Sequence, residues 1–309
     1  MTDRPPLRMQ IKLNATPERI FAALTDSEAL ETWFVEHADI DPDANRYDFW
    51  GKFTPEAPDK ESGQHRLLAY EPNRSLKFAW NWSDQETEVS FTLHPRGDQT
   101  ILAVEQDRGQ PGKHQIDSYT MEDFWFLSLE NLRRYLDGKP CDIRATFPIP
   151  ETGNIEFAIN IDAEPERVFD VLTNPEEVER WIASDAEIDL QPGGKYLLGW
   201  EGMESMKIVE LEDNQKLAIT MVGMDGESGT VVTWTLEGSG GKTRLTLVHS
   251  GFGLDEKTEG LQAGWRNFMG WVRSVAEYGP AWEPALVPLQ PEATIYPRIM
   301  MDLQSELVW

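Results

Sequence analysis

Cysteine is almost missing from this sequence. Cys141 is the single cysteine among 309 residues, so a disulfide within the chain and a cysteine-based zinc site are both excluded. One thiol in a chain of this length is typical of proteins that work in a reducing compartment. We therefore expect a cytoplasmic protein.

Long apolar runs are missing as well. No stretch approaches the roughly 20 apolar residues that span a bilayer. The residues from Met1 to Pro6 contain no apolar core of a secretory signal. The prediction is a protein without membrane insertion.

Basic residues are few, and the 28 lysines and arginines stand against 54 aspartates and glutamates, which gives a net charge of −26. This charge disfavours nucleic acid and anionic membranes as partners, because both are bound by neutralising phosphates. Apolar residues, in contrast, make up 40% of the chain, and 12 residues are tryptophan. These residues predict packed cores, and the length suits two domains.

The chain contains an internal repeat. Residues 159–181 match residues 11–33 at 11 of 23 positions without a gap, which indicates a duplication. The match continues at slightly different spacing, for example between residues 89–93 and 232–236. The predicted organisation is a first domain over 1–142, a linker over 143–154, a second domain over 155–280 and a Pro-containing tail over 281–309. The tail is apolar enough to dock on a domain, with a contact to a partner chain as the alternative.

Both copies show the same order of predicted elements. An alternating strand (9–13 and 157–161) comes first, followed by a short helix and a second helical turn that ends at Trp33 or Trp181. Several strands separated by turn signals follow, and a long helix closes each copy, over 118–137 and 258–278. Strands joined by tight turns predict an antiparallel sheet, whose apolar face the closing helix must cover.

The alternation of side chains predicts which residues face inward. In the second copy these are Leu217, Ile219, Met221, Val232, Trp234, Leu236, Leu245, Leu247 and His249. In the first copy they are Leu76, Phe78, Trp80, Trp82, Val89, Phe91, Leu93, Leu102 and Val104. Trp80 and Trp82 stand where the second copy has Met221 and Gly223. We therefore expect the larger usable pocket in the second domain and a nearly filled first domain.

These residues resemble a known family. The run A-x-P-E-x-V-F-x-x-L-T-x-P-E-x-x-x-x-W extends from Ala163 to Trp181 and, nearly as well, from Ala15 to Trp33. With the later Pro-Gly-Gly, His-Ser-Gly-Phe and Gly-Trp motifs at 192–194, 249–252 and 264–265, it is similar to the heat-shock-protein-90 ATPase activator homologue family of the START-like (SRPBCC) superfamily.

The resemblance implies an α+β fold of two tandem helix-grip domains, each a curved antiparallel sheet around a long C-terminal helix. It also implies a cavity between sheet and helix, because members of the superfamily bind lipids, sterols, polyketides or other apolar molecules, and a minority are cyclases or hydrolases. The first copy departs from the pattern, since residues 106–109 read Gln-Asp-Arg-Gly in place of His-Ser-Gly-Phe.

The candidate ligand-binding residues belong to the second copy. They are Met221, Trp234, Leu247, His249, Trp265 and Met269. His249 ends an inward-facing strand and is suited to bond the polar end of a ligand; the alternative is a histidine that caps the sheet edge or bonds a loop carbonyl. The aromatic residues among them form either a cavity wall or ordinary core packing.

Other chemistry finds no support in the sequence. Gln191 to Lys195 lacks the spacing of a phosphate-binding loop and predicts a hairpin turn. The remaining histidines lack metal-ligand spacing, no nucleophile motif is present, and the sequence implies no catalytic residue, no metal and no cofactor.

The function predicted first is therefore non-enzymatic binding of a small apolar molecule, mainly by the second domain. The alternatives are a stress- or chaperone-associated module that binds a protein partner, and a cyclase- or hydrolase-like enzyme. An enzyme needs at least two polar groups that converge in the cavity, and His249 and Glu210 are the candidates.

Overall fold

The computed structural model describes residues 5–82, 85–108, 118–200, 206–222 and 229–286. The chain forms two compact units, Met1–Ile149 and Pro150–Pro284, and the described residues Ala285 and Leu286 belong with the first. Each unit holds one antiparallel sheet of seven strands. The predicted α+β class with two tandem helix-grip domains is confirmed.

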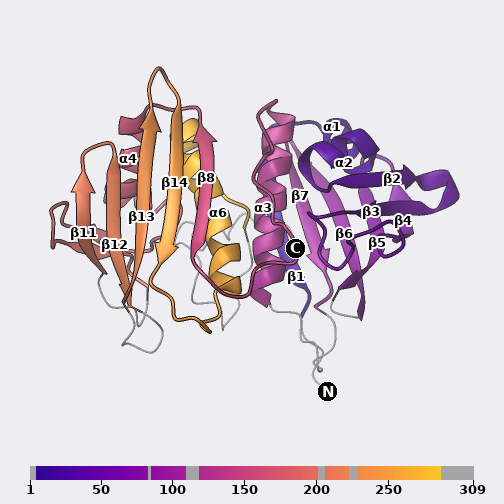
Figure 1. The fold of residues 1–309 in the computed structure, drawn as a ribbon. Coiled ribbons are helices and arrows are strands. Elements are labelled where there is room, and N and C mark those ends of the chain that lie inside the picture. Colours follow the sequence, from indigo (N-terminus) through magenta and orange to yellow (C-terminus); the bar gives the residue numbers. More distant parts are fainter. Residues whose placement is uncertain (1–4, 83–84, 109–117, 201–205, 223–228, 287–309) are drawn as a thin grey trace. The chain divides into compact units, whose positions relative to one another are not determined.

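The first unit begins with a strand, continues with two short helices and ends with a long one (Figure 1). Its helices are α1 (Pro17–Thr25), α2 (Ser27–Trp33), the 3-10 turn η1 (Pro42–Ala44) and α3 (Ser118–Leu136). Its strands are β1 (Leu7–Leu13), β2 (His37–Asp41), β3 (Arg46–Trp50), β4 (Arg66–Glu71), β5 (Ser75–Trp82), β6 (Gln85–Arg96) and β7 (Gln99–Gln106).

The second unit repeats this order. Its helices are α4 (Pro165–Thr173), α5 (Pro175–Val178), α6 (Glu259–Tyr278) and the 3-10 turn η2 (Gly279–Ala281). Its strands are β8 (Ile155–Ile161), β9 (Glu187–Ile188), β10 (Lys195–Leu197), β11 (Met206–Glu212), β12 (Lys216–Val222), β13 (Gly229–Gly238) and β14 (Thr243–Ser250).

Both sheets have the same topology. The strand order is β1-β7-β6-β5-β4-β3-β2 in the first unit and β8-β14-β13-β12-β11-β10-β9 in the second. The first strand of each copy therefore pairs with the last, and Leu13 lies opposite Thr100 just as Ile161 lies opposite Thr243. Figure 1 shows each closing helix, α3 or α6, running alongside the strands of its own sheet.

The predicted inward faces are confirmed. All nine residues predicted to face inward in the first copy are buried. In the second copy the same holds for eight of the nine, and Met221 is half-buried. These faces alternate with exposed or half-exposed residues along each strand, which is the pattern of a sheet with one buried face.

Hydrogen bonds from the indole N–H to a helix carbonyl explain why the repeated motif ends in tryptophan. The last carbonyls of a helix have no partner within it. Trp33 Nε1 donates to the Ala23 carbonyl of α1, and Trp181 Nε1 donates to the Val171 carbonyl of α4, both at 2.9 Å. The next carbonyls, of Leu24 and Leu172, accept bonds from the buried hydroxyls of Tyr47 at 2.6 Å and Tyr196 at 2.9 Å.

The arginine of the Pro-Glu-Arg motif has an equivalent role at the closing helix. Arg19 Nη2 donates to the Leu136 carbonyl at the end of α3 at 2.9 Å, and Arg167 Nη2 donates to the Val275 carbonyl of α6 at 3.1 Å. A cation near a helix C-terminus is also favoured by the helix dipole. The repeated motif thus holds each copy's first and last helices together.

Three local predictions differ from the structure. Strands β1 and β8 begin two residues earlier than predicted, at Leu7 and Ile155. The second helical turn of the second copy is α-helical only to Val178, because the amides of Arg180 and Trp181 bond carbonyls three residues back in a tighter turn.

The Pro-Gly-Gly segment is a turn, as predicted. It joins β9 to β10, and Gly193 has a φ of +80°, which favours glycine. A side chain on Gly194 would meet the Asp189 carbonyl oxygen at 2.0 Å. A strand follows, where a phosphate-binding loop would lead into a helix.

The segment after the second unit returns to the first strand of the chain. Gln10 and Leu286 exchange two backbone hydrogen bonds, of 2.9 and 2.7 Å, along the outer edge of β1. The predicted tail beyond Leu286, residues 287–309, lies outside the described residues, so its docking stays a prediction.

Candidate functional site

The six predicted binding residues converge on one side of the second sheet. Four lie on neighbouring strands and two on α6, and all face the space between sheet and helix. They are Met221 on β12, Trp234 on β13, Leu247 and His249 on β14, and Trp265 and Met269 on α6. Trp234 lies opposite Leu247 in the strand register and packs edge-on against Trp265, at 5.7 Å between ring centroids. Their role as a binding site stays a prediction.

His249 bonds neither a sheet edge nor a loop carbonyl. Its Nδ1 accepts a hydrogen bond from Trp265 Nε1 at 3.0 Å, and its Nε2 lies 2.8 Å from Thr230 Oγ1. Because an indole nitrogen can only donate, Nδ1 carries no proton and Nε2 donates to the threonine. Thr230 Oγ1 in turn donates to the Met221 carbonyl at 3.3 Å. The network joins β14, β13 and α6.

The environment keeps this histidine neutral. Only 1% of its surface is exposed, and desolvation lowers the pKa of His249 to about 4. The Phe252 ring packs against the imidazole, with 4.5 Å between the two ring centroids. Both ring nitrogens are already engaged, so His249 is not free to bond the polar end of a ligand.

The first domain contains the same network with glutamine in place of histidine. Trp125 Nε1 donates to Gln106 Oε1 at 2.6 Å, and Gln106 Nε2 donates to Thr87 Oγ1 at 3.1 Å. Thr87 Oγ1 donates to the Trp80 carbonyl at 2.9 Å, just as Thr230 does to that of Met221. A glutamine amide thus reproduces the pattern of the neutral imidazole with a group that does not titrate.

The sequence interpretation did not find the threonines. Their signal was present, because Thr87 and Thr230 lie two residues before the matching segments that begin at Val89 and Val232. Extending the alignment by one inward-facing position would have placed a hydroxyl beside His249 in the second copy.

The inner walls of the two domains, formed by the inward-facing side chains of the sheet, carry different types of side chain. The strand registers, including a β-bulge at the same place in β4 and β11, make four wall positions equivalent. In the first domain rings occupy them, and in the second domain aliphatic and thioether side chains do. The pairs are Phe49 and Leu198, His65 and Met206, Phe78 and Ile219, and Trp80 and Met221.

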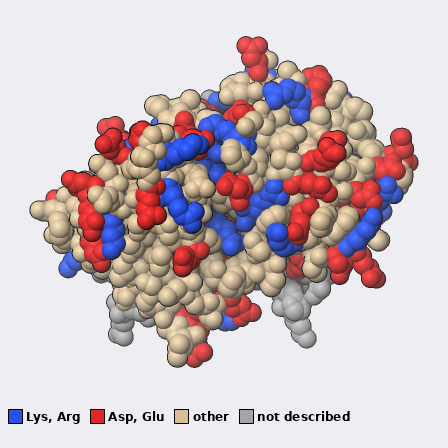
Figure 2. Space-filling model, turned by 45° about the horizontal axis from the view of Figure 1, so that its top comes forward, with Lys and Arg blue, Asp and Glu red and all other residues tan. Residues whose placement is uncertain are grey.

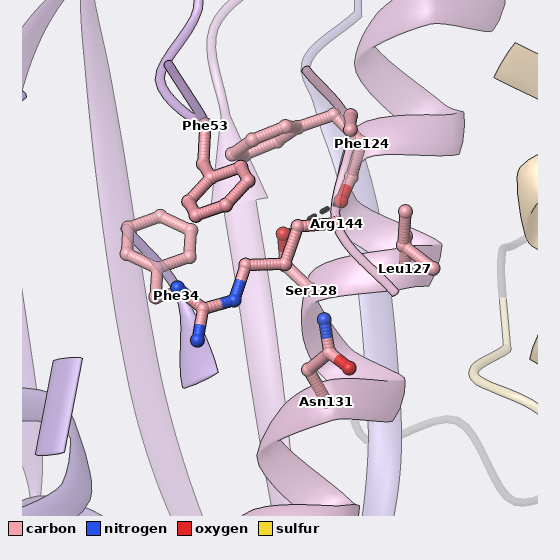
Figure 3. Close-up of a pocket in the computed structure, with 8 residues that line it drawn as sticks. Phe34, Phe53, Phe124, Leu127, Ser128, Asn131 and Arg144 are labelled. Carbon is pink, nitrogen blue, oxygen red and sulfur yellow. Dashed lines mark hydrogen bonds between the residues drawn. The ribbon is translucent and has the colours of Figure 1, made fainter. Parts of the chain in front are cut away.

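Rings also surround a small pocket in the first domain (Figure 3). Its lining includes Phe34, Phe53 and Phe124 together with Asn131 and Arg144. The enclosed volume of about 10 Å³ takes a single water molecule at most. The first domain therefore leaves little room here.

Arg144, which follows α3 within the first unit, lines this pocket. Its guanidinium donates to the carbonyls of Glu31, Thr32 and Val35 at the end of α2 and lies 4.8 Å from the centre of the Phe53 ring. Burial lowers the pKa of Arg144. The sequence interpretation assigned this residue to the linker and missed its contacts.

Glu210, predicted as a polar group of the cavity, does not lie in the interior of the domain. Glu210 is exposed on β11, where it forms an ion pair with Lys216. Its nomination as a partner of His249 was wrong, because Glu210 lies next to the bulge of β11, on the solvent side of the strand. Gly223, the predicted counterpart of Trp82, lies outside the described residues.

The described part of the chain shows neither a metal cluster nor a membrane-spanning helix. Among its residues, no group of three or more His, Cys, Asp or Glu side chains is placed to hold a metal ion. Of its helices, none is long and apolar enough to cross a membrane.

Two seven-stranded sheets, each packed against a long closing helix, define a tandem START-like protein of the helix-grip class. The chain belongs to the family described as "Activator of Hsp90 ATPase homolog 1-like protein", whose model matches residues 14–137 and 162–274. The two matches coincide with the two copies of the repeat, and this fold supports ligand-binding domains in general. Among curated proteins, no relative matches the chain.

Several solved structures are similar to it. DynU16, from the dynemicin biosynthetic locus, is 19% identical over 89% of this chain and 98% of its own, with a TM-score of 0.35. CalU16 from Micromonospora echinospora is 26% identical over 41% of this chain and 76% of its own, with a TM-score of 0.35. The Aha1 dimer from Colwellia psychrerythraea is 22% identical over 42% of this chain and all of its own (100%), with a TM-score of 0.37.

Proposed function

We propose that the chain binds a small apolar molecule without transforming it, mainly in the interior of the second domain. The observation that supports this is the exchange of rings for flexible side chains at equivalent wall positions. Trp80 and His65 of the first domain correspond to Met221 and Met206 of the second. Methionine is unbranched and polarizable, so it adapts its shape to an inserted molecule more readily than an indole does.

The polar network holds one side of this interior in place. It ties α6 to β13 and β14 through His249, Thr230 and Trp265. Since these groups satisfy one another, the ligand contacts mainly apolar atoms, and shape rather than charge selects it. The molecule's net charge of −26 also favours uncharged ligands over anionic ones.

Reciprocal substitutions in the full chain test the assignment to the second domain. Met221→Trp introduces the residue of the first domain, and Trp80→Met introduces that of the second. The probe is N-phenyl-1-naphthylamine, an uncharged dye whose fluorescence rises in apolar surroundings. We expect Met221→Trp to weaken binding by about tenfold, since overfilling a packed interior costs about 1 to 3 kcal/mol. Trp80→Met, the matched control, should leave this site's affinity unchanged.

The proposal fails if the wild-type chain does not bind the dye. It also fails in its assignment if Trp80→Met, rather than Met221→Trp, changes the affinity of the measured site. Circular dichroism of both variants confirms that each is folded before the titrations are compared.

A protein-interaction role is the alternative, and two exposed leucines favour it. Leu254, in the loop between β14 and α6, is 97% exposed, and Leu261 at the start of α6 is 40% exposed. Exposed apolar residues that gather on a surface mark many contact sites for proteins. A chain that binds no uncharged dye would favour this role.

A further inference from the structure

One set of buried polar side chains between the sheet and α6 of the second domain is engaged in mutual hydrogen bonds. Both nitrogens of His249, the hydroxyl of Thr230 and the indole N–H of Trp265 bond one another or the Met221 carbonyl. None of these groups is left to recognise a ligand. Trp234 is different.

Trp234 is 1% exposed, and its Nε1 has no hydrogen-bond partner among the residues that the structure describes. Three other indoles of this domain are bonded. Trp181 donates to the Val171 carbonyl at 2.9 Å, Trp200 to the Ile182 carbonyl at 2.7 Å, and Trp265 to His249. Leaving a buried donor unbonded costs about 1 to 3 kcal/mol, a cost that Trp80 Nε1 of the first domain also carries, so hydrogen bonding among the described residues gives no reason for an indole at this position.

The first domain shows that an indole is not required for packing there. Phe91 occupies the equivalent position of β6 and is buried to 2% exposure in the same kind of sheet. It fills the wall with a ring that has no N–H. The difference between the two copies at this position is therefore a hydrogen-bond donor.

The donor lies in the middle of the apolar wall. In the strand register Trp234 stands between Leu217 of β12 and Leu247 of β14, and its ring meets that of Trp265. An indole N–H donates and cannot accept, so it pairs with an oxygen or nitrogen acceptor. A charged acceptor would have to be desolvated among leucines inside a strongly acidic molecule, which is unfavourable.

We infer that Trp234 determines ligand specificity by donating its indole hydrogen to one uncharged acceptor, so that the second domain selects apolar molecules with a carbonyl oxygen, such as aromatic ketones or esters, over the corresponding hydrocarbons. This inference rests on the proposed function of the second domain and adds the chemical class of its ligand.

A pair of probes that differ in one oxygen tests the inference in the full chain. One is 6-propionyl-2-(dimethylamino)naphthalene, and the other is its deoxygenated counterpart, 6-propyl-2-(dimethylamino)naphthalene. The variant is Trp234→Phe, which installs the residue of the first domain. We expect it to weaken binding of the ketone by about tenfold, the effect of one buried hydrogen bond. Binding of the propyl compound should change by less than about twofold, because it lacks the carbonyl oxygen that accepts the indole hydrogen.

A spectroscopic readout tests the bond itself. The ketone emits at longer wavelength when its carbonyl accepts a hydrogen bond, so its bound emission should be red-shifted in wild type relative to Trp234→Phe. In the wild-type chain, the assigned indole N–H resonance of Trp234 should move downfield when the ketone binds and stay in place when the propyl compound binds. This second measurement decides the matter if the variant does not fold.

The outcomes separate the two claims. If neither probe binds, the proposed function fails and this inference falls with it. If both probes bind and Trp234→Phe weakens both equally, or neither, then the donor has no role in selection and only the inference is overturned.

Discussion

At the scale of the residue, one substitution between the copies replaces a permanent hydrogen-bonding group with a titratable one. Gln106 and His249 occupy the same place in the same network. Protonation of His249 would turn Nδ1 into a donor that faces the Trp265 N–H, and the bond would be lost. The second domain therefore depends on pH at a point where the first does not.

The direction of this pH dependence follows from the two pKa values. Burial lowers the folded-state pKa of His249 to about 4, and an unfolded histidine titrates near about 6.5. Between these values the unfolded chain binds a proton that the folded domain does not. The stability from this residue is complete above about pH 6.5 and is lost progressively as the pH falls toward 4, by on the order of 3 kcal/mol in all.

We predict that His249→Gln removes this part of the acid sensitivity. Urea unfolding at pH 7 and pH 5 should show a smaller loss of stability in the variant than in wild type, by about 2 kcal/mol, from the linkage between proton binding and unfolding. His65 has a pKa also lowered to about 4 by burial, but it is present in both proteins and cancels in the comparison. Identical pH profiles for the two proteins would contradict the prediction.

Only part of the candidate site is predictable from the sequence. Strict alternation of side chains placed Trp234, Leu247 and His249 on one inward face. It could not tell that His249 is engaged, because the partner Trp265 comes from a helix whose rotation against the sheet depends on packing. Arg144 was beyond prediction as well, since a residue in an irregular segment has no periodicity to show what it contacts.

At the scale of the element, the two copies share the hydrogen bonds at the ends of their short helices more strictly than they share the side chains of the inner wall. The carbonyls at the end of α1 and α4 accept bonds from a tryptophan and a tyrosine in both copies. Burial raises the pKa of Tyr47 and of Tyr196, so both hydroxyls stay protonated and donate at any physiological pH. These rings fix where the short helices end.

We predict that Tyr196→Phe destabilises the second domain by about 1 to 3 kcal/mol, because the buried Leu172 carbonyl then lacks its partner. The free energy of unfolding in urea measures the effect. Tyr70→Phe is the control, since that ring is 37% exposed and the loss of a hydroxyl at the surface should change stability by no more than about 0.5 kcal/mol. Equal midpoints for Tyr196→Phe and wild type would show that the bond contributes nothing.

Order and type of most elements were predictable, because the period of the apolar residues changes from two to about three and a half along each copy and glycines and prolines mark the turns. The end of α5 was not. Its turn tightens after Val178, and the period of the apolar residues does not show where a helical turn gives way to a tighter one.

At the scale of the whole molecule, charge is the dominant property. The chain has 26 more acidic than basic residues, and Figure 2 shows basic side chains lying next to acidic ones on the face that it presents. Many of the ion pairs are exposed, such as Arg8 with Glu105 and Lys60 with Asp39. Exposed pairs contribute about 0 to 1 kcal/mol each, so they do not offset the repulsion among the excess carboxylates.

We predict that sodium chloride stabilises the protein. Raising its concentration from about 0.1 to 1 M shortens the screening length from about 10 to 3 Å and weakens both the ion pairs and the longer-range repulsion. Because the excess charge is all of one sign, the relief of repulsion outweighs the weakening of the ion pairs, and the thermal midpoint at pH 7 should rise by several degrees. At pH 5, closer to the isoelectric point of about 4.5, the same addition of salt should raise it less. A midpoint that falls with salt at pH 7 would mean that the ion pairs, and not the net charge, set the electrostatic contribution to folding.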